Sequence, residues 1–94
     1  MITTKKRGKF EIYGDMLEAI GSESEFEGGA RLTRVQSRSN LAYDRFRKDL
    51  STLQDRGLVQ VNEGEETTLR LTEAGREYLR HYRDVRKFLE TYGL

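Results

Sequence analysis

The spacing of apolar residues changes twice along this chain of 94 residues, and the order of the changes restricts the fold more than any other feature. Before Gly57 apolar side chains recur every three or four residues, as in amphipathic helices. From Leu58 to Leu71 they alternate with polar ones, which is typical of short strands. Beyond Thr72 the helical spacing returns. The length allows one small domain, whose predicted order is helices, a hairpin and a last helix.

Three helices are predicted before the hairpin, at about residues 9–20, 31–37 and 41–56. Residues 21–29 are small and acidic, and we expect them to form a loop. Gly14 in the first helix costs about 1 kcal/mol relative to alanine. The close approach of a neighbouring helix would explain this glycine.

The third predicted helix is the one that turns a polar face to the surroundings. Its inward side chains are Ala42, Phe46, Leu50 and Leu53. Ser39 or Asn40 would supply its N-cap, or the cap would be absent.

The predicted hairpin joins strands at 58–61 and 67–71, and Thr72 is a suitable N-cap for the last helix. Two helices joined by a tight turn and followed by a hairpin describe a winged helix-turn-helix, a mainly α fold with a small β-hairpin. We therefore divide the chain into a basic arm (1–8), a winged helix-turn-helix domain (9–72) and a C-terminal helix (73–94).

The 17 Lys and Arg residues and the 16 Asp and Glu residues nearly cancel, but they are unevenly distributed. Residues 31–48 carry six cationic side chains against Asp44 alone. Such a local positive face is typical of nucleic-acid-binding proteins, although ordinary solvated helix charges give the same pattern.

Other classes of protein find little support in the sequence. The absence of Cys excludes disulfides and thiolate zinc sites. We find no Ser-His-Asp set, phosphate loop or metal-ligand spacing, so we expect no enzymatic activity, no cofactor and no metal. No apolar run approaches the roughly 18 residues of a membrane span, and no signal-peptide pattern is present, so we expect a cytoplasmic protein without membrane contact.

Double-stranded DNA is the partner that the basic block predicts. Arg47 is our first choice for base readout, because a guanidinium binds guanine through two hydrogen bonds, and Lys48, Arg38 and Ser39 are candidates for phosphate. The full set of predicted DNA-binding residues is Arg34, Arg38, Ser39, Asn40, Tyr43, Asp44, Arg45, Arg47 and Lys48. Alternatively, Arg47 and Lys48 are simply exposed charges, and Asp44 pairs with Lys48 one turn later.

The last helix carries an apolar seam with the spacing of a coiled coil. Its members are Tyr78, Tyr82, Val85, Leu89 and Tyr92. The seam either packs on the first helix of the same chain or joins two copies. Its size favours a homodimer, because a domain this small cannot cover so many apolar side chains.

Several runs of the sequence are shared with a known family: residues 7–13, 17–20, 33–35, 40–46, 57–59 and 71–76, with Leu50 and Leu53. Together they resemble an archaeal winged-helix family that includes the ten-kilodalton Sulfolobus chromatin protein and many small regulators. The most specific runs are N-L-x-Y-x-x-F from Asn40 and L-T-E-x-G-R from Leu71. The resemblance implies binding to duplex DNA and dimerisation through an antiparallel coiled coil of the last helices.

Three features depart from that family pattern. Residues 22–29 look like an insertion, and Ala42 stands where the family usually has a capping Ser. The hairpin tip, with Glu63, Glu65 and Glu66, is more acidic than a phosphate-binding wing. These acids leave open a protein-binding winged-helix adaptor that does not bind nucleic acid.

Overall fold

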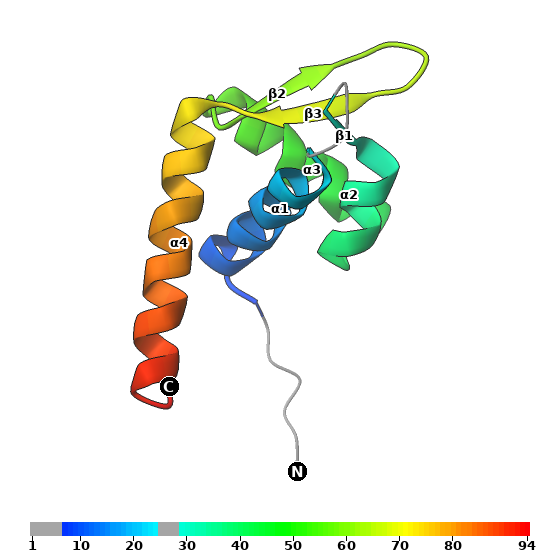
Figure 1. Cartoon of the computed structure of the whole chain (residues 1–94). Coiled ribbons are helices and arrows are strands. Elements are labelled where there is room, and N and C mark those ends of the chain that lie inside the picture. The colour runs from blue at the N-terminus through cyan, green and yellow to red at the C-terminus, as the bar shows by residue number, and fades with distance from the viewer. Residues whose placement is uncertain (1–6, 25–28) are drawn as a thin grey trace.

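The computed structural model describes residues 7–24 and 29–94. Its elements are α1 (Lys9–Glu23), β1 (Ala30–Arg31), α2 (Leu32–Ser39), α3 (Tyr43–Asp55), β2 (Val59–Asn62), β3 (Thr68–Leu71) and α4 (Glu73–Thr91). Figure 1 shows α1 at the centre, with α2 on one side, α4 on the other and the strands across one end. The predicted fold class, mainly helical with a small antiparallel sheet, is confirmed.

The described residues form a sheet of three strands in the order β1-β3-β2, in which both pairs are antiparallel. β2 and β3 are the predicted hairpin, with Val59 opposite Leu71. β1 was not predicted, and Arg31, which we expected in the second helix, belongs to it. Ala30 pairs with Leu69, so this two-residue strand depends on a partner far along the chain.

Several helix boundaries differ from the sequence prediction. α2 continues to Ser39, two residues beyond its predicted end. α1 continues to Glu23, into the segment that we expected to be a loop. α3 begins at Tyr43, and Ala42 precedes it with an extended backbone. Ala42 therefore falls outside the helical period and is exposed, so its predicted inward position is wrong. Residues 1–6 of the expected arm and residues 25–28 of the expected loop lie outside the described residues.

The core joins side chains from all four helices and from the sheet. The predicted inward positions of Phe46, Leu50 and Leu53 are confirmed. The largest fully buried apolar side chains are Phe46, Met16, Leu17, Ile20, Leu53, Leu69 and Val35. Because this core holds one side of α3, the opposite side of the helix faces outward.

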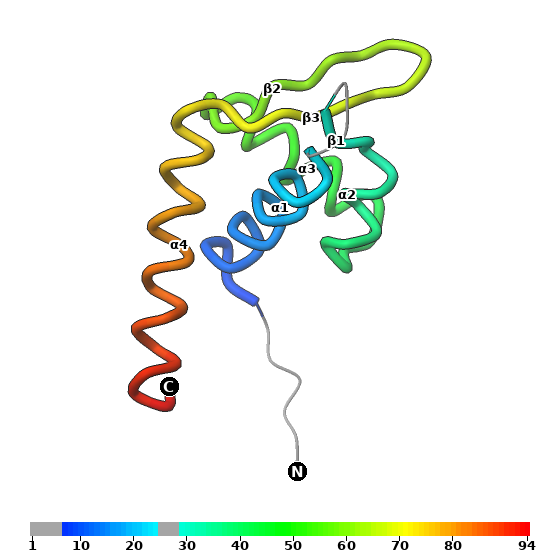
Figure 2. Tube along the Cα trace, viewed as in Figure 1, coloured from blue at the N-terminus to red at the C-terminus, as the bar shows by residue number. Residues whose placement is uncertain are grey.

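α4 starts where the sequence predicted. The Gly75 amide donates a hydrogen bond of 3.0 Å to the Thr72 hydroxyl, so the predicted N-cap is confirmed. Figure 2 shows α4 leaving the strands and running alongside α1 toward the opposite end of the molecule. A Cβ atom at Gly14 would lie 2.3 Å from the Tyr82 ring. The predicted close approach at Gly14 is thus confirmed, and the neighbouring helix is α4.

Candidate nucleic-acid interface

The turn between α2 and α3 is built around Asn40. Its backbone is left-handed, with φ 54° and ψ 45°, and this conformation ends α2. Asparagine tolerates this region better than most residues with a side chain. The Gln36 side-chain amide donates to the Leu41 carbonyl at 2.7 Å and holds the far side of the turn. Asn40 therefore ends α2 and does not cap α3, which has no side-chain cap bond.

The outward face of α3 carries two of the predicted cations. Tyr43, Asp44 and Lys48 are exposed on α3, and Arg47 is half-buried. Neither Arg47 nor Lys48 has an ion-pair partner among residues 7–24 and 29–94. The alternative pairing of Asp44 with Lys48 is not formed in the structure. These two cations are thus available to an anionic partner.

The other predicted arginines are held by buried carboxylates. Arg38 pairs with Glu23 at 3.3 Å, and Arg34 lies 4.0 Å from the same carboxylate. Arg45 pairs with Asp49 at 2.7 Å. Glu23 and Asp49 are buried, while all three guanidinium side chains stay about half exposed or more. The carboxylates orient the arginines and leave their outer edges accessible.

Sequence reasoning missed both of these carboxylates. Asp49 follows Arg45 by four residues, so helical spacing could have found that pair. Glu23 gave no such signal, because it was assigned to a loop and its partners lie on another helix.

Ser39 does not lie on the outward face. Its side chain is buried, and its hydroxyl donates a hydrogen bond of 2.7 Å to the Val35 carbonyl. The predicted phosphate contact of the Ser39 side chain is therefore wrong. The serine lies in the last turn of α2, where a short hydroxyl bonds back to the carbonyl four residues earlier.

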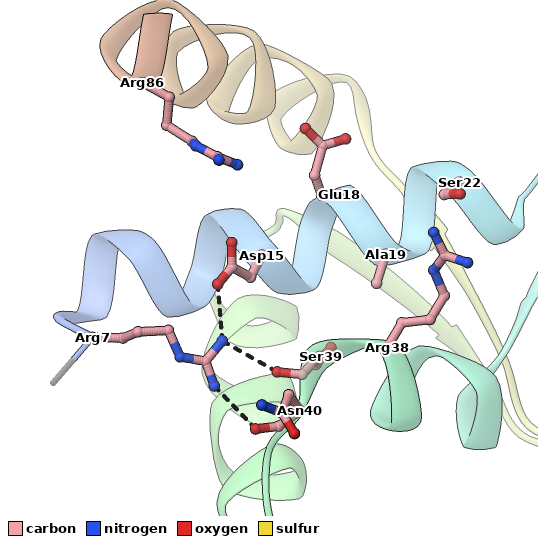
Figure 3. A pocket seen from close by; sticks show the side chains of 9 residues that line it. All are labelled: Arg7, Asp15, Glu18, Ala19, Ser22, Arg38, Ser39, Asn40 and Arg86. Atoms are coloured by element: carbon pink, nitrogen blue, oxygen red, sulfur yellow. Dashed lines mark hydrogen bonds and ion pairs between the residues drawn. The ribbon is translucent and has the colours of Figure 1, made fainter. Parts of the chain in front are cut away.

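Arg7 joins the start of α1 to the turn between α2 and α3. Its guanidinium donates to Asp15 at 2.8 Å and to the carbonyls of Ser39 and Asn40 at 3.2 and 3.1 Å (Figure 3). The other oxygen of Asp15 accepts a hydrogen bond of 2.6 Å from the Tyr82 hydroxyl on α4. Burial and this bond raise the pKa of Tyr82 to about 12, so the hydroxyl stays a donor. We expected Arg7 in the basic arm, but here it ties three helices together.

Replacing Arg7 with alanine is expected to lower the free energy of unfolding by about 1.5–3 kcal/mol, the usual range for hydrogen bonds to charged groups. The reason is that Asp15 and two carbonyls at the end of α2 lose a donor together. Urea denaturation followed by circular dichroism measures the change. Lys9→Ala is the matched control, because Lys9 is exposed and has no ion pair among the described residues. Equal midpoints for the two variants would contradict a structural role for Arg7.

The seam of α4 is divided between two environments. Tyr82 is only 3% exposed, because its ring packs over Gly14 and lies 5.3 Å from the Phe10 ring. Tyr78 is half-buried and lies 5.6 Å from the same ring. Tyr82 therefore belongs to the core of its own chain, and its assignment to a dimer interface is wrong. Tyr78 also packs largely against its own chain.

The second half of the seam is uncovered in the single chain. Its apolar side chains, with Phe10 beside them, are 38–80% exposed: Phe10, Val85, Phe88, Leu89, Tyr92 and Leu94. Phe88 and Tyr92 contact each other, with ring centroids 4.9 Å apart. We call Val85, Phe88, Leu89 and Tyr92 the α4 stripe.

Comparison with known proteins agrees with this architecture. A family model described as winged helix-turn-helix matches residues 6–90. The chain belongs to the winged helix-turn-helix family. No curated protein matches the sequence.

Solved structures similar to this winged helix-turn-helix chain come from archaea and bacteria. Sso10a-2, a DNA-binding protein from Sulfolobus solfataricus, is 25% identical with a TM-score of 0.73, over 92% of this chain and 85% of that one. AF1382 from Archaeoglobus fulgidus is 18% identical with a TM-score of 0.74, over 85% and 89%. The PcaV transcriptional regulator from Streptomyces coelicolor is 25% identical with a TM-score of 0.66, over 85% of this chain and 62% of that one.

The wing of this winged helix-turn-helix chain is the hairpin of β2 and β3, and its tip is acidic. Glu63, Glu65 and Glu66 are exposed there. Glu66 pairs with Arg31 of β1 at 3.4 Å, and Glu63 accepts a hydrogen bond from Thr67. Arg70 on β3 is the one cation in the hairpin, and it is exposed. The wing therefore offers much less positive charge than α2 and α3 do.

The part of the chain that the structure describes offers neither a metal site nor a membrane span. No group of three or more His, Cys, Asp or Glu side chains there could hold a metal ion. None of the described helices is both long and apolar enough to cross a membrane.

Proposed function

We propose that this chain binds double-stranded DNA as a homodimer and acts as a regulator of transcription or a local chromatin protein. The observation that carries the proposal is the outward face of α3, where Arg47 and Lys48 have no ion-pair partner among the described residues. Duplex DNA is a dense polyanion, and binding neutralises its phosphates with Lys and Arg. The description of the similar Sso10a-2 as a DNA-binding protein supports the proposal.

In this proposal α3 enters the major groove as the recognition helix. Arg47 reads guanine, while Lys48 and Tyr43 contact phosphate. Asp44 orients its basic neighbours or accepts a hydrogen bond from a cytosine amine. Asn40 lies at the entry to the helix, and its amide suits adenine.

The arginines beside α3 take part in positioning the duplex. Arg34 and Arg38 on α2 contact phosphate while they stay paired with the buried Glu23 carboxylate, because the outer edges of their guanidinium groups remain exposed. Arg45 lies on the flank of α3 and bonds to Asp49, so we expect a smaller contribution from it. The wing touches DNA weakly through Arg70.

The homodimer would form through the α4 stripe. An exposed apolar stripe of this kind normally marks an interface. In the dimer two copies of α3 would meet one duplex, which raises the number of phosphates engaged and so the affinity.

Replacing both Arg47 and Lys48 with alanine is expected to weaken DNA binding by about tenfold to a hundredfold, since one base contact and one phosphate contact are lost. The measurement is fluorescence anisotropy with duplexes selected from a random pool, at several salt concentrations. For wild type with about six phosphate contacts, affinity should fall roughly a thousandfold between 50 and 200 mM salt. The slope for the double variant should be smaller by about one contact.

The matched control is Arg80→Ala with Lys87→Ala, which removes two exposed cations from α4. A double variant that binds DNA as well as this control would refute the role of α3. A wild-type protein that ignores duplex DNA even at low salt would refute the whole proposal and favour the protein-binding adaptor. A protein partner held by apolar contacts would show no such salt dependence.

A further inference from the structure

A cavity of about 670 Å³ lies between the first turn of α1, one flank of α3 and the start of α4. Its volume falls within the range of about 300–1,000 Å³ that is usual for small-molecule sites. The cavity lies beside the outward face of α3, and the two surfaces are separate apart from one shared residue. Lys48 belongs to both, because it lies at the edge of that face and also lines the cavity.

Apolar and aromatic groups line part of this cavity. Tyr13 of α1 and Tyr78 of α4 contribute two half-buried rings, and Leu53 and Leu58 lie with them. The Tyr78 hydroxyl donates to the Phe10 carbonyl at 3.3 Å, which fixes its ring. Burial, and then the neighbouring Tyr13, raise the pKa of Tyr78, so the phenol is neutral. These groups suit a flat apolar body rather than a bare inorganic ion.

Cationic side chains dominate the charge of the lining. They are Lys9 from α1 with Arg45, Lys48 and Arg56 from α3 and its end, and the one carboxylate in the lining is Asp49. Asp49 is bound by Arg45 at 2.7 Å. The three remaining cations have no ion pair among residues 7–24 and 29–94, so the lining keeps a surplus of about three positive charges.

The shape and the charge together define the ligand. We propose that this cavity binds a small aromatic anion, with its ring against Tyr13 and Tyr78 and its carboxylate or phosphate group facing Lys9, Lys48 and Arg56. Duplex DNA does not suit the apolar lining, because its phosphates lie on a convex rod and reach only a rim. The ligand class is therefore an aromatic carboxylate or phosphate of one or two rings.

Occupation of the cavity has a consequence for α3. The bound anion neutralises Lys48, and Lys48 is one of the two cations on the outward face that have no ion pair within the described part of the chain. On the proposed function, the anion would therefore lower the affinity for DNA. This coupling rests on the DNA-binding proposal, whereas the site itself does not.

The site is tested first without DNA, with 2-naphthoate as the probe. The chain has five Tyr and no Trp, so naphthalene fluorescence can be excited apart from the protein. We expect saturable binding that is at least about tenfold weaker for the uncharged 2-naphthamide and for acetate, which lacks a ring. No saturation up to millimolar probe, or equal binding of the amide, would overturn the site.

Variants locate the probe on the protein. Arg56→Ala and Lys9→Ala should each weaken 2-naphthoate binding by about fivefold, a usual effect for a partly exposed charge contact. Lys87→Ala on the exposed side of α4 is the control and should change nothing. Circular dichroism verifies that each variant is folded. An affinity that is the same in Arg56→Ala, Lys9→Ala and the control would place the probe elsewhere and overturn the site.

The coupling is tested by titrating 2-naphthoate into the complex with a fluorescent duplex, with acetate at equal ionic strength as the control. We expect a lower DNA affinity with 2-naphthoate alone, and no such effect in Arg56→Ala. If the probe binds and DNA affinity is unchanged, the coupling is wrong and the site stands. If wild type binds no DNA at any salt, the proposed function fails, and the first titration still decides the site.

Discussion

Replacing Gly75 with alanine is expected to destabilise the chain by about 3 kcal/mol, at the upper end of the usual cost of overpacking a core. A Cβ atom at this position would lie 2.1 Å from the carbonyl oxygen of Leu58. That oxygen accepts the Thr72 amide at 3.1 Å, so it cannot move without loss of a second bond. The first turn of α4 would have to lift away from the end of α3, and the Thr72 cap would open.

Urea denaturation measures this change, with Gly64→Ala as the matched control. Gly64 is exposed in the wing, and the nearest neighbour of its added Cβ would lie 3.8 Å away. We expect the control to unfold within about 0.5 kcal/mol of wild type. A Gly75→Ala midpoint equal to the control would mean that α4 does not cross Leu58 as closely as the structure has it.

The two glycines of the helices differ in what the sequence reveals. Gly14 stands inside a strongly apolar helical pattern, where a glycine is unfavourable, and so it predicts a close neighbour. Gly75 follows the N-cap Thr72 and gives no comparable signal. Its requirement comes from the path of residues 57–58, which only the folded chain defines. Local patterns thus report local strain, while contacts between distant segments stay hidden.

The same distinction explains the strands and helices. α1 and α3 were predicted because their apolar residues keep a helical period over ten or more residues. The hairpin was predicted because apolar and polar residues alternate over about four residues in each strand. β1 has two residues and therefore no period, and it exists because Ala30 pairs with Leu69. The end of α1 was also missed, because Glu23 is stabilised by arginines of α2 and not by its own neighbours.

For the candidate site, sequence reasoning predicted the outward face of α3 but not the state of each charge. Lys48 lies opposite the inward positions of Phe46 and Leu50 and is exposed, whereas Arg47 lies on the flank of the helix and is half-buried. The spacing of Arg45 and Asp49 could have revealed their pair, but the pairing of the α2 arginines depends on where the buried Glu23 lies in three dimensions. The α4 seam could likewise be recognised as one stripe from its spacing. The sequence could not reveal the boundary at Tyr82, where the seam passes from residues packed in their own chain to exposed residues.

That boundary decides how the dimer should be tested. Glutamate at Tyr82 would place a charge between α1 and α4 and remove the bond to Asp15, so it would unfold the chain and not separate two copies. Leu89 is 38% exposed, whereas Tyr82 is 3% exposed, so we expect a change at Leu89 to leave the folded chain intact. Leu89→Glu is therefore the informative substitution.

Leu89→Glu is expected to convert a dimer into a folded monomer and to lower DNA affinity by about a hundredfold to ten-thousandfold. The charge would be buried and unpaired in an apolar interface, which is strongly unfavourable. In the dimer, binding of one recognition helix holds the second at a high effective concentration near the same duplex. The monomer loses this advantage, which accounts for the fall in affinity. Sedimentation equilibrium and anisotropy measure the two effects. Thr91→Glu adds the same charge at an exposed polar position of α4 and should leave both unchanged. A wild-type protein that sediments as a monomer at all concentrations would show that the α4 stripe does not join two copies.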